Sequence, residues 1–194
     1  MDAKTKTNLL RAFAGECQAR IRYEIAAKVA GKSGLPVLQD MLYFTANQEK
    51  EHAVIFYNFL KDVFKDENVS MMANYPIDIN EDLASLLDAA SRHEYDEATS
   101  IYKQFGEEAK EEGYIEIATT FFMISEIENY HYERFKKYHD LLTSGKLFKE
   151  NNNIKWMCLN CGFIYEGNEA VTVCPVCKHP QGYSLRLNET QFHL

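Results

Sequence analysis

The sequence predicts an all-α four-helix bundle followed by a small β-rich metal-binding domain. Four long segments repeat apolar residues with the 3.6-residue period of an α-helix. Two Glu-x-x-His motifs, Glu49 to His52 and Glu128 to His131, lie inside two of these segments. Two Cys-x-x-Cys pairs follow near the C-terminus. These three observations indicate a bundle that carries one metal site and a compact module that carries another.

Residues that end helices separate the four expected segments. We expect helices over residues 7–30, 37–64 and 81–112, and a fourth from just after Gly113 to about Leu142. Glycine and proline between the first two segments, Gly113 after the third, and Gly145 after the fourth are the stop signals. Short turns make the first and second helices antiparallel neighbours, and likewise the third and fourth.

A longer connection separates the second helix from the third. It ends at Asn80, a good N-cap before two acidic residues. A connection of this length allows the crossover of ferritin-like bundles. We therefore expect a ferritin-like bundle over residues 1–146, a linker over 147–153 that includes three consecutive asparagines, and a β-rich metal module over 154–194.

The composition argues against several classes of protein. A net charge of −8 and a pI near 5.3 argue against nucleic acid as a partner, because phosphate binding requires clustered Lys and Arg. No stretch approaches the roughly 18 apolar residues of a membrane span, and the N-terminus lacks a signal-peptide pattern. Five cysteines, four of them paired by spacing, fit metal ligation in a reducing compartment. We expect a soluble, cytoplasmic protein.

Each expected helix places ionisable side chains on its own apolar face. A Glu and a His three residues apart lie about 60° apart around a helix, so both can reach one site. Burying an unpaired carboxylate is costly, and acids that face inward are therefore expected to share cations. The inward-facing ionisable residues are Glu16, Glu49, His52, Glu94, Glu97, Glu128 and His131.

This combination of carboxylates and imidazoles predicts a dinuclear metal centre. Two Glu-x-x-His motifs plus one Glu from each of the other two helices form the known four-helix recipe for such a centre. Oxygen-rich ligation with two imidazoles suits iron or manganese, held about 3.5–4 Å apart. Glu97 is one carboxylate more than the recipe requires, and an extra ligand lets one ion change partners. Either motif alone could be a core salt bridge or a coincidence, and Arg20, near the Glu16 face, could hydrogen-bond a ligand.

The C-terminal cysteines predict a second, tetrahedral metal site. Four thiolates fit iron and zinc equally well in geometry. The aromatic residues around them would lower the dielectric near the sulfurs, or would simply form the core of a tiny domain. The cysteines that form this predicted site are Cys158, Cys161, Cys174 and Cys177.

The fifth cysteine belongs to a different feature. Cys17 projects away from the metal face of the first helix, within a second apolar stripe. A four-helix bundle buries one stripe per helix, so a second stripe predicts a contact with another chain, most simply in a homodimer. The stripe consists of Leu10, Ala14, Cys17, Ile21 and Ile25.

With both sites in place, the chain resembles the rubrerythrins, in which a ferritin-like di-iron bundle precedes a rubredoxin-like domain. The resemblance covers essentially the whole chain and implies two iron ions in the bundle and one in the cysteine site, where zinc is possible. Lys178 departs from the family, which commonly has glycine there. The matching motifs are Glu16-Cys-Gln-Ala-Arg-Ile-Arg-Tyr, Gln48-Glu-Lys-Glu-His, Glu94-x-x-Glu97, Glu111-Glu-Gly-Tyr, Glu128-x-x-His131, and Trp156-Met-Cys through Cys177.

The resemblance also implies a role for each ligand. One carboxylate from each Glu-x-x-His motif would bridge the irons, and one iron would exchange a carboxylate for a histidine with oxidation state. The implied assignments are bridging by Glu49 and Glu128, one iron held by Glu94 and His131, and the other held by Glu16 with either Glu97 or His52.

The activity implied by the resemblance is an NADH-peroxidase-type reduction of hydrogen peroxide to water, which protects against oxidative stress. No Gly-x-Gly-x-x-Gly motif is present, so the nicotinamide must bind a separate reductase, and the electrons arrive from that reductase or from a rubredoxin. Tyr23 and Tyr102 are candidate proton donors. The alternative is a ferritin-like ferroxidase or iron-handling protein whose cysteines hold a structural zinc.

Overall fold

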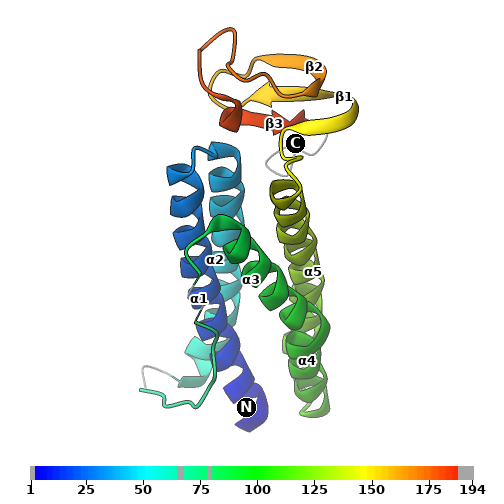
Figure 1. The fold of residues 1–194 in the computed structure, drawn as a ribbon. Helices are drawn as coiled ribbons and strands as arrows, with labels where there is room; N and C mark the ends of the chain where they lie inside the picture. The colour runs from blue at the N-terminus through cyan, green and yellow to red at the C-terminus, as the bar shows by residue number, and fades with distance from the viewer. Residues whose placement is uncertain (1–2, 65–67, 78–79, 188–194) are drawn as a thin grey trace.

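The computed structural model describes residues 3–64, 68–77 and 80–187, and helices form most of these ranges (Figure 1). Among the described residues, no helix is both long and apolar enough to span a membrane. The predicted ferritin-like bundle with a small β-rich C-terminal module is confirmed. The helices are α1 (Ala3–Lys32), α2 (Pro36–Phe64), α3 (Leu83–Asp96), the π-helix η1 (Glu97–Ile101), α4 (Tyr102–Glu111) and α5 (Ile115–Thr143).

The bundle consists of two antiparallel hairpins. α1 lies beside α2, and the interrupted third helix, made of α3, η1 and α4, lies along α5 (Figure 1). The first hairpin turns at Gly34, whose φ of 71° is a left-handed conformation that favours glycine. The second turns at Gly113, with a φ of 84°, and Tyr114 N–H then donates to the Ala109 carbonyl at 2.8 Å. Both turns lie at the predicted breaks.

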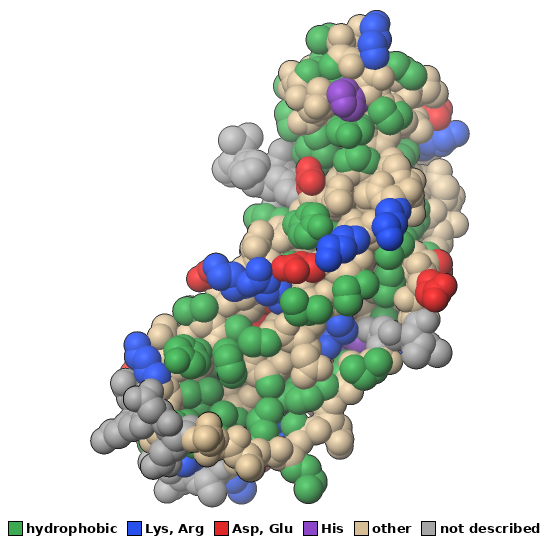
Figure 2. All heavy atoms as spheres, turned by 90° about the vertical axis from the view of Figure 1, so that its left-hand side faces the viewer, with side chains coloured by type: hydrophobic (Ala, Val, Ile, Leu, Met, Phe, Trp, Pro, Cys, Tyr) green, Lys and Arg blue, Asp and Glu red, His purple; other side chains and the backbone are tan. Residues whose placement is uncertain are grey.

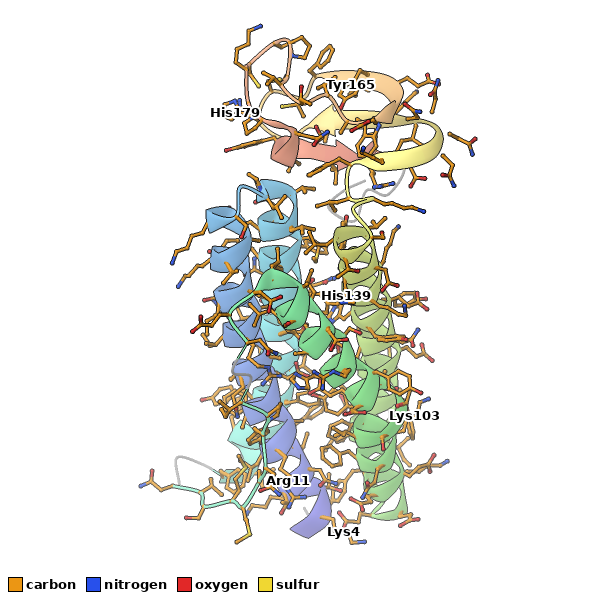
Figure 3. All side chains as sticks on the ribbon, in the orientation of Figure 1. Lys4, Arg11, Lys103, His139, Tyr165 and His179 are labelled. Atoms are coloured by element: carbon orange, nitrogen blue, oxygen red, sulfur yellow. The ribbon has the colours of Figure 1, made fainter. Side chains whose placement is uncertain are left out.

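The described part of the crossover, residues 68–77, is hydrogen-bonded to α1. Tyr75 Oη donates to the Arg11 carbonyl at 2.8 Å. Arg11, labelled in Figure 3, donates in turn from Nη2 to the Met72 carbonyl at 3.2 Å. These bonds hold the crossover against the outer side of the first hairpin.

The third helix begins later than predicted. Asp82 Oδ1 accepts a hydrogen bond from Ser85 N–H at 2.9 Å, which makes Asp82 the N-cap. The predicted cap, Asn80, lies two residues earlier, so that prediction was wrong. Both residue types can cap a helix, and the later start makes Leu83, which is buried, the first helical residue.

A π-helical turn, which the apolar pattern did not predict, interrupts the same helix. The Tyr102 N–H donates to the carbonyl of Glu97, five positions earlier. In a continuous α-helix, Tyr102 would lie about 80° around the helix from Glu94. The extra residue in the turn returns Tyr102 to the core side, where Tyr102 and Glu94 are both buried. The π turn therefore decides which side chains reach the centre of the bundle.

Two apolar clusters fill the bundle, one on either side of a polar layer. The cluster nearer the C-terminal module includes Leu38 and Phe135. The cluster toward the opposite end includes Leu9 and Phe121. Along each hairpin, the ionisable residues that were predicted to face inward lie between these clusters. Apolar packing thus closes the polar layer at both ends.

The C-terminal module is a three-stranded antiparallel sheet in the order β2-β1-β3. Residues 149–153, expected to belong to the linker, form the first half of β1, where Lys149 pairs with Glu169. The division of the chain into domains stays a prediction. The elements of the module are β1 (Lys149–Cys158), β2 (Ile164–Glu169), the 3-10 turn η2 (Gln181–Tyr183) and β3 (Ser184–Arg186).

The module packs on the end of the bundle where α1 turns into α2 (Figure 1). Leu185 of β3 is buried in the same apolar cluster as Val37 of α2. Arg186 is also buried, and its Nη2 donates to the carbonyl of Lys146, just after α5, at 2.6 Å. Apolar contacts and one buried cation therefore fasten the sheet to both hairpins.

Gly182 in η2 lies close against the turn between α1 and α2. A Cβ at this position would overlap the carbonyl oxygen of Gly34 in the α1–α2 turn and would press on Pro36 Cδ at 3.2 Å. A side chain at position 182 therefore cannot fit without moving the backbone.

We predict that Gly182→Ala weakens the docking of the module. Overpacking against a backbone oxygen costs about 1–3 kcal/mol, which should appear as a lower free energy of unfolding in denaturant. Gly167→Ala is the matched control, because the nearest atom to its new Cβ is the Glu169 carbonyl oxygen at 3.5 Å. Equal stability of the two variants would contradict the close packing of Gly182 against the Gly34 carbonyl oxygen.

Candidate metal centres

The predicted carboxylates and histidines meet in the polar layer, among the side chains that fill the space between the two hairpins (Figure 3). They form two groups of four, and within each group the ligand atoms lie within 4.8 Å of one another. Glu49 and Glu128 belong to both groups and so lie between the two positions. All members are buried. The groups are Glu16, Glu49, His52 and Glu128, and Glu49, Glu94, Glu128 and His131.

The two histidines point the same ring nitrogen at the shared carboxylates. His52 Nδ1 lies 2.9 Å from Glu128 Oε1 and 3.1 Å from Glu49 Oε2. His131 Nδ1 lies 2.7 Å from Glu128 Oε2 and 2.9 Å from Glu49 Oε1. The two rings are 5.8 Å apart and inclined by 23°. Two nitrogens arranged about two shared carboxylates match the ligand pattern of two adjacent cations.

The donor atoms converge on common points rather than on one another. Carboxylate oxygens of Glu16, Glu49, Glu94 and Glu128 are buried without a hydrogen-bond partner among the described residues, and so is His131 Nδ1. Their contacts with the imidazoles are close but lack hydrogen-bond alignment. Buried polar atoms are rarely left in this state. Cations between them would satisfy these atoms, and the oxygen and imidazole donors fit iron.

Two buried tyrosines hold the outer oxygens of the terminal carboxylates. Tyr23 Oη donates to Glu94 Oε1, and Tyr102 Oη donates to Glu16 Oε1 at 2.5 Å. Burial raises the pKa of each phenol well above its usual value, and the charge of the neighbouring carboxylate raises it further. Each tyrosine therefore orients one carboxylate and keeps a proton beside the cluster.

The protonation of the metal-free cluster reflects the number of buried acids. Burial raises the pKa of Glu94 to about 8, with the charge of Glu49 as the next cause. Burial also raises the pKa of Glu16 well above its usual value. For Glu49, burial acts in the same direction, but contacts with His131 and His52 outweigh it and hold the pKa below the usual range.

Glu97, the extra carboxylate, lies outside both groups of four. It is half-buried at the start of the π turn and lines two adjoining pockets of about 800 and 450 Å³. Tyr75 and Pro76 of the crossover line the same two pockets. Burial, followed by the charge of Glu94, raises the pKa of Glu97. In this arrangement His52 belongs to the cluster and Glu97 lies at its edge.

Sequence reasoning missed two polar residues beside the cluster. Gln48 Oε1 lies 3.1 Å from His131 Nε2 and accepts a hydrogen bond from Arg134 Nη1 at 3.0 Å. Arg134 follows His131 by three positions on α5, and this spacing was the available signal. Arg20, considered as a partner of a ligand, pairs with Glu24 at 2.9 Å.

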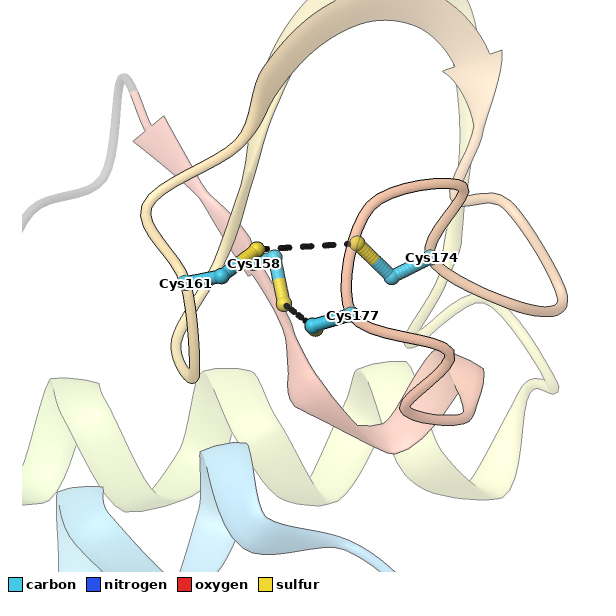
Figure 4. Close-up of side chains that lie close together, drawn as sticks. All are labelled: Cys158, Cys161, Cys174 and Cys177. Carbon is cyan, nitrogen blue, oxygen red and sulfur yellow. Dashed lines mark hydrogen bonds between the residues drawn. The ribbon is translucent and has the colours of Figure 1, made fainter.

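The four cysteines form the second predicted site (Figure 4). Cys158 Sγ lies 3.6 Å from Cys177 Sγ, and Cys161 Sγ lies 3.7 Å from Cys174 Sγ. A tetrahedral ion with metal–sulfur bonds of about 2.3 Å requires sulfur–sulfur separations of about 3.8 Å. The backbone N–H of His179 donates to the Cys177 sulfur and lowers the pKa of that thiol to about 5. The site therefore fits one tetrahedral iron or zinc ion.

The two cysteine loops share one backbone design. Gly162 N–H donates to the Cys158 carbonyl at 2.8 Å, and Lys178 N–H donates to the Cys174 carbonyl at 3.0 Å. Gly162 has a φ of 74° and Lys178 a φ of 64°. The lysine that departs from the family pattern thus occupies a left-handed position, which costs a side chain about 1 kcal/mol. Its Nζ donates to the Pro175 carbonyl at 2.8 Å and offsets part of this strain.

We predict that Glu128→Ala abolishes metal binding in the bundle and leaves the cysteine site loaded. Glu128 contributes to both positions, so its loss removes a ligand from each ion at once. Glu49→Ala should behave in the same way, whereas Glu126→Ala changes an exposed acid on the same helix and should have no effect. Metal analysis of the purified chains measures this. A Glu128→Ala bundle that keeps both ions would refute the shared position of Glu128.

A second prediction concerns pH: the metal-free bundle loses stability as pH rises from about 5 to 8. Folded Glu94 keeps its proton to about pH 8, against a usual value of 4.5. Burial lowers the pKa of His52 and His131, but the surrounding carboxylates outweigh it, and both stay protonated above their usual value of 6.5. Because the folded chain then binds more protons than the unfolded chain, the free energy of unfolding falls with rising pH.

The lowered pKa of Glu49 acts only below pH 4.5 and leaves this window unchanged. Bound metal reverses the slope, because the ligands bind in their deprotonated forms. Thermal unfolding between pH 5 and 8, with and without metal, measures both slopes. If stability changed with pH in the same way with and without metal, the protonation proposed for the metal-free cluster would be contradicted.

Comparison with known proteins agrees with both sites. Residues 7–139 match the family profile described as Rubrerythrin, and residues 156–183 match that described as Rubrerythrin, rubredoxin-like domain. The rubrerythrin of Clostridium perfringens is 44% identical over 187 residues, which cover 96% of each chain. That of Nitratidesulfovibrio vulgaris is 37% identical, over 93% of each chain.

The solved structures agree in fold. Nigerythrin in its fully reduced state has a TM-score of 0.65 at 23% identity, covering 96% of this chain and 88% of nigerythrin. Symerythrin from Cyanophora paradoxa has a TM-score of 0.61 at 22% identity, covering 74% of this chain and 88% of symerythrin. The cluster in the bundle fits two iron ions, and the cysteine site fits one iron or zinc ion. With both family profiles matched and relatives aligned over nearly its whole length, the chain belongs to the rubrerythrin family.

Proposed function

We propose that this protein reduces hydrogen peroxide to water at the dinuclear site, with electrons that enter at the cysteine site from an NAD(P)H-dependent reductase or a rubredoxin. Each peroxide takes up two electrons and two protons and yields two molecules of water. The observation that carries the proposal is the presence, in one chain, of a buried two-ion site and a sulfur-only site. The bound iron pair would supply the two electrons, and a cysteine-bound iron would replace them.

The chain supplies protons from two sides of the cluster. Tyr23 donates its hydroxyl hydrogen to Glu94, and Tyr102 donates its own to Glu16. Because their pKa values are raised by burial, both phenols hold their protons at neutral pH. Each phenol–carboxylate pair can therefore retain a proton next to the reacting oxygen atoms until it is needed.

A small substrate can approach along the π turn. The smaller of the two pockets beside Glu97 is also lined by Tyr102, whose hydroxyl contacts the cluster at Glu16. Apolar packing closes the polar layer toward both ends of the bundle. This side of the bundle, beneath Tyr75 and Pro76 of the crossover, is therefore the proposed route for peroxide.

The position of the C-terminal module bears on the path of the electrons. Gly182 packs against Pro36 at the start of α2. Glu49 lies thirteen positions further along this helix, which is about 20 Å at 1.5 Å per residue. Electron transfer slows steeply with distance. The proposal therefore includes transfer from the cysteine site of one chain to the bundle of another in a homodimer.

The second apolar stripe on α1 offers a surface for this dimer. Ile21 and Ile25 are 52% and 51% exposed, and together with Cys17 they line a pocket of about 390 Å³ with mainly apolar walls. Figure 2, which views the molecule from the side on which α1 lies in Figure 1, shows apolar side chains exposed among charged ones. Burial of these residues against a second chain would remove apolar surface from water.

We predict that Cys158→Ser blocks steady-state peroxide reduction by NAD(P)H and a reductase but spares a single turnover of chemically reduced protein. The serine removes one of four sulfur ligands and leaves the bundle unchanged. Anaerobic stopped-flow mixing with peroxide measures the single turnover, and NAD(P)H oxidation measures the steady state. Unchanged steady-state turnover would sink the electron-entry role of the cysteine site.

Mixed dimers extend this prediction to transfer between chains. A Cys158→Ser chain keeps the dinuclear site, and a Glu128→Ala chain keeps the cysteine site. Heterodimers isolated by two different tags should recover about half of the wild-type activity, because one of two symmetry-related paths is intact. Verified heterodimers without activity would refute transfer between chains.

The metal in the cysteine site helps to distinguish a peroxide reductase from the alternative, an iron-handling protein with a structural zinc. Ferric iron bound by four thiolates absorbs visible light, whereas zinc in the same site leaves no such band. A chain that carries zinc at the cysteines, oxidises ferrous iron with oxygen and fails to reduce peroxide would be an iron-handling protein instead.

A further inference from the structure

Gln48 and Arg134 form a hydrogen-bonded brace on the outer side of His131. We infer that Gln48, held by Arg134, is a positioning residue that locks His131 in place and decides which of its ring nitrogens faces the Glu94–His131 position of the dinuclear site. The inference rests on the proposed function only in taking the buried cluster as a two-ion site. It assigns a role to side chains that are not themselves metal ligands.

The brace determines which nitrogen of His131 faces the metal. Arg134 can only donate hydrogen bonds, so the atom of the Gln48 amide that faces it at 3.0 Å must be the oxygen. The same oxygen lies 3.1 Å from His131 Nε2, which must therefore carry the hydrogen. When the ring gives up its second proton to bind a cation, Nδ1 therefore keeps the lone pair, and it is this atom that faces the carboxylates of Glu49 and Glu128. An imidazole in this form is ready to bind a cation.

Arg134 is itself held by a second hydrogen bond and by an aromatic ring. Its Nη1 also donates to Thr45 Oγ1 at 2.9 Å, and the hydroxyl of Thr45 donates to the Met41 carbonyl at 3.1 Å. The guanidinium carbon lies 5.2 Å from the centre of the Phe44 ring. Desolvation of the largely enclosed guanidinium lowers its pKa from the usual value. An arginine restrained in this way fixes the amide of Gln48.

The helices bring the brace together by spacing alone. Thr45 and Gln48 precede His52 on α2 by seven and four positions and so lie on its side of the helix. Arg134 follows His131 by three positions on α5. The brace therefore joins the two helices that carry the shared carboxylates, at the level of the cluster.

His52 lacks a corresponding support. Its Nδ1 faces the shared carboxylates in the same manner as that of His131. Among the described residues, however, every hydrogen bond and ion pair of His52 is made by Nδ1, and none by Nε2. The two imidazoles thus differ in restraint although they match in orientation. The support that Gln48 gives is therefore specific to the His131 half of the cluster.

The test is a metal titration of Gln48 variants in the full-length chain. Gln48→Leu removes the acceptor and Gln48→Glu keeps it, while Asn47→Leu makes the equivalent amide-to-leucine change at the neighbouring exposed position. The sample carries zinc in its cysteine site and no metal in the bundle. It is titrated with Co²⁺, and calorimetry measures the affinity of each of the two bundle sites. Loss of an outer hydrogen bond to a ligating histidine weakens metal binding about 10–100-fold.

We expect Gln48→Leu to lower the affinity for one of the two Co²⁺ ions by this factor. Gln48→Glu and Asn47→Leu should bind both ions with wild-type affinity. A proton NMR signal supplies an independent readout. The hydrogen on His131 Nε2 should give a Co²⁺-shifted exchangeable resonance that disappears in Gln48→Leu and persists in the other two variants. Arg134→Met removes the hydrogen bond that holds Gln48 but keeps the one from Gln48 to His131. It should lower the affinity for the same ion by a smaller factor.

Wild-type affinity for both ions in Gln48→Leu, or equal losses in Gln48→Leu and Gln48→Glu, would overturn the inference. Circular dichroism and thermal unfolding confirm that each variant is folded, and Arg134→Met carries the test if Gln48→Leu is not. The titration needs no peroxide. If the wild-type chain does not reduce peroxide but Gln48→Leu lowers the affinity for one of its two ions, the proposed function is refuted and this inference stands.

Discussion

Buried negative charge at the centre of the bundle is the constraint on which the rest of the structure depends. The carboxylates of Glu16, Glu49, Glu94 and Glu128 lie between two apolar clusters that exclude water, where unbalanced charge is costly. Two divalent ions would balance four carboxylates. In the metal-free chain protons must take their place, which is why burial raises the pKa of Glu94 to about 8. A more highly charged ion pair would favour a further carboxylate, and Glu97 lies at the edge of the same layer.

The residues that meet at both sites could be predicted from the sequence, Glu97 excepted, because their placement rests on local geometric rules. A Glu and a His three positions apart share one face of a helix, and two such pairs on apolar faces have few explanations other than metal. Two Cys-x-x-Cys pairs need only a chain reversal between them to bring four sulfurs together, and the sulfurs of Cys158 and Cys177 indeed lie 3.6 Å apart. The glycines that end the hairpins follow from the left-handed turns that only glycine adopts cheaply.

The features that escaped prediction all depend on contacts between elements distant in sequence. The apolar pattern around Tyr102 suits a continuous α-helix as well as a π turn, and the choice is made by the contact of Tyr102 with Glu16 on α1. The bond between Gln48 and Arg134 depends on the register of α2 against α5, which no local pattern encodes. Strand β1 extends through the asparagine run despite its poor strand propensity, because Lys149 before the run and Ile154 after it both pair with β2, with an irregularity in register between them.

The π turn and the brace lie on different halves of the dinuclear site, and the difference has a physical logic. The proposed turnover would change the charge of the site, which would then need fixed ligands to retain its ions and a further carboxylate to match the new charge. On one half, Gln48 and Arg134 hold His131. On the other, His52 has no such support, and the turn that carries Glu97 is the one irregular part of the third helix within the described residues. Glu97 is half-buried, lines two pockets and belongs to neither apolar cluster, so its side chain is not enclosed by the packing that surrounds the other carboxylates.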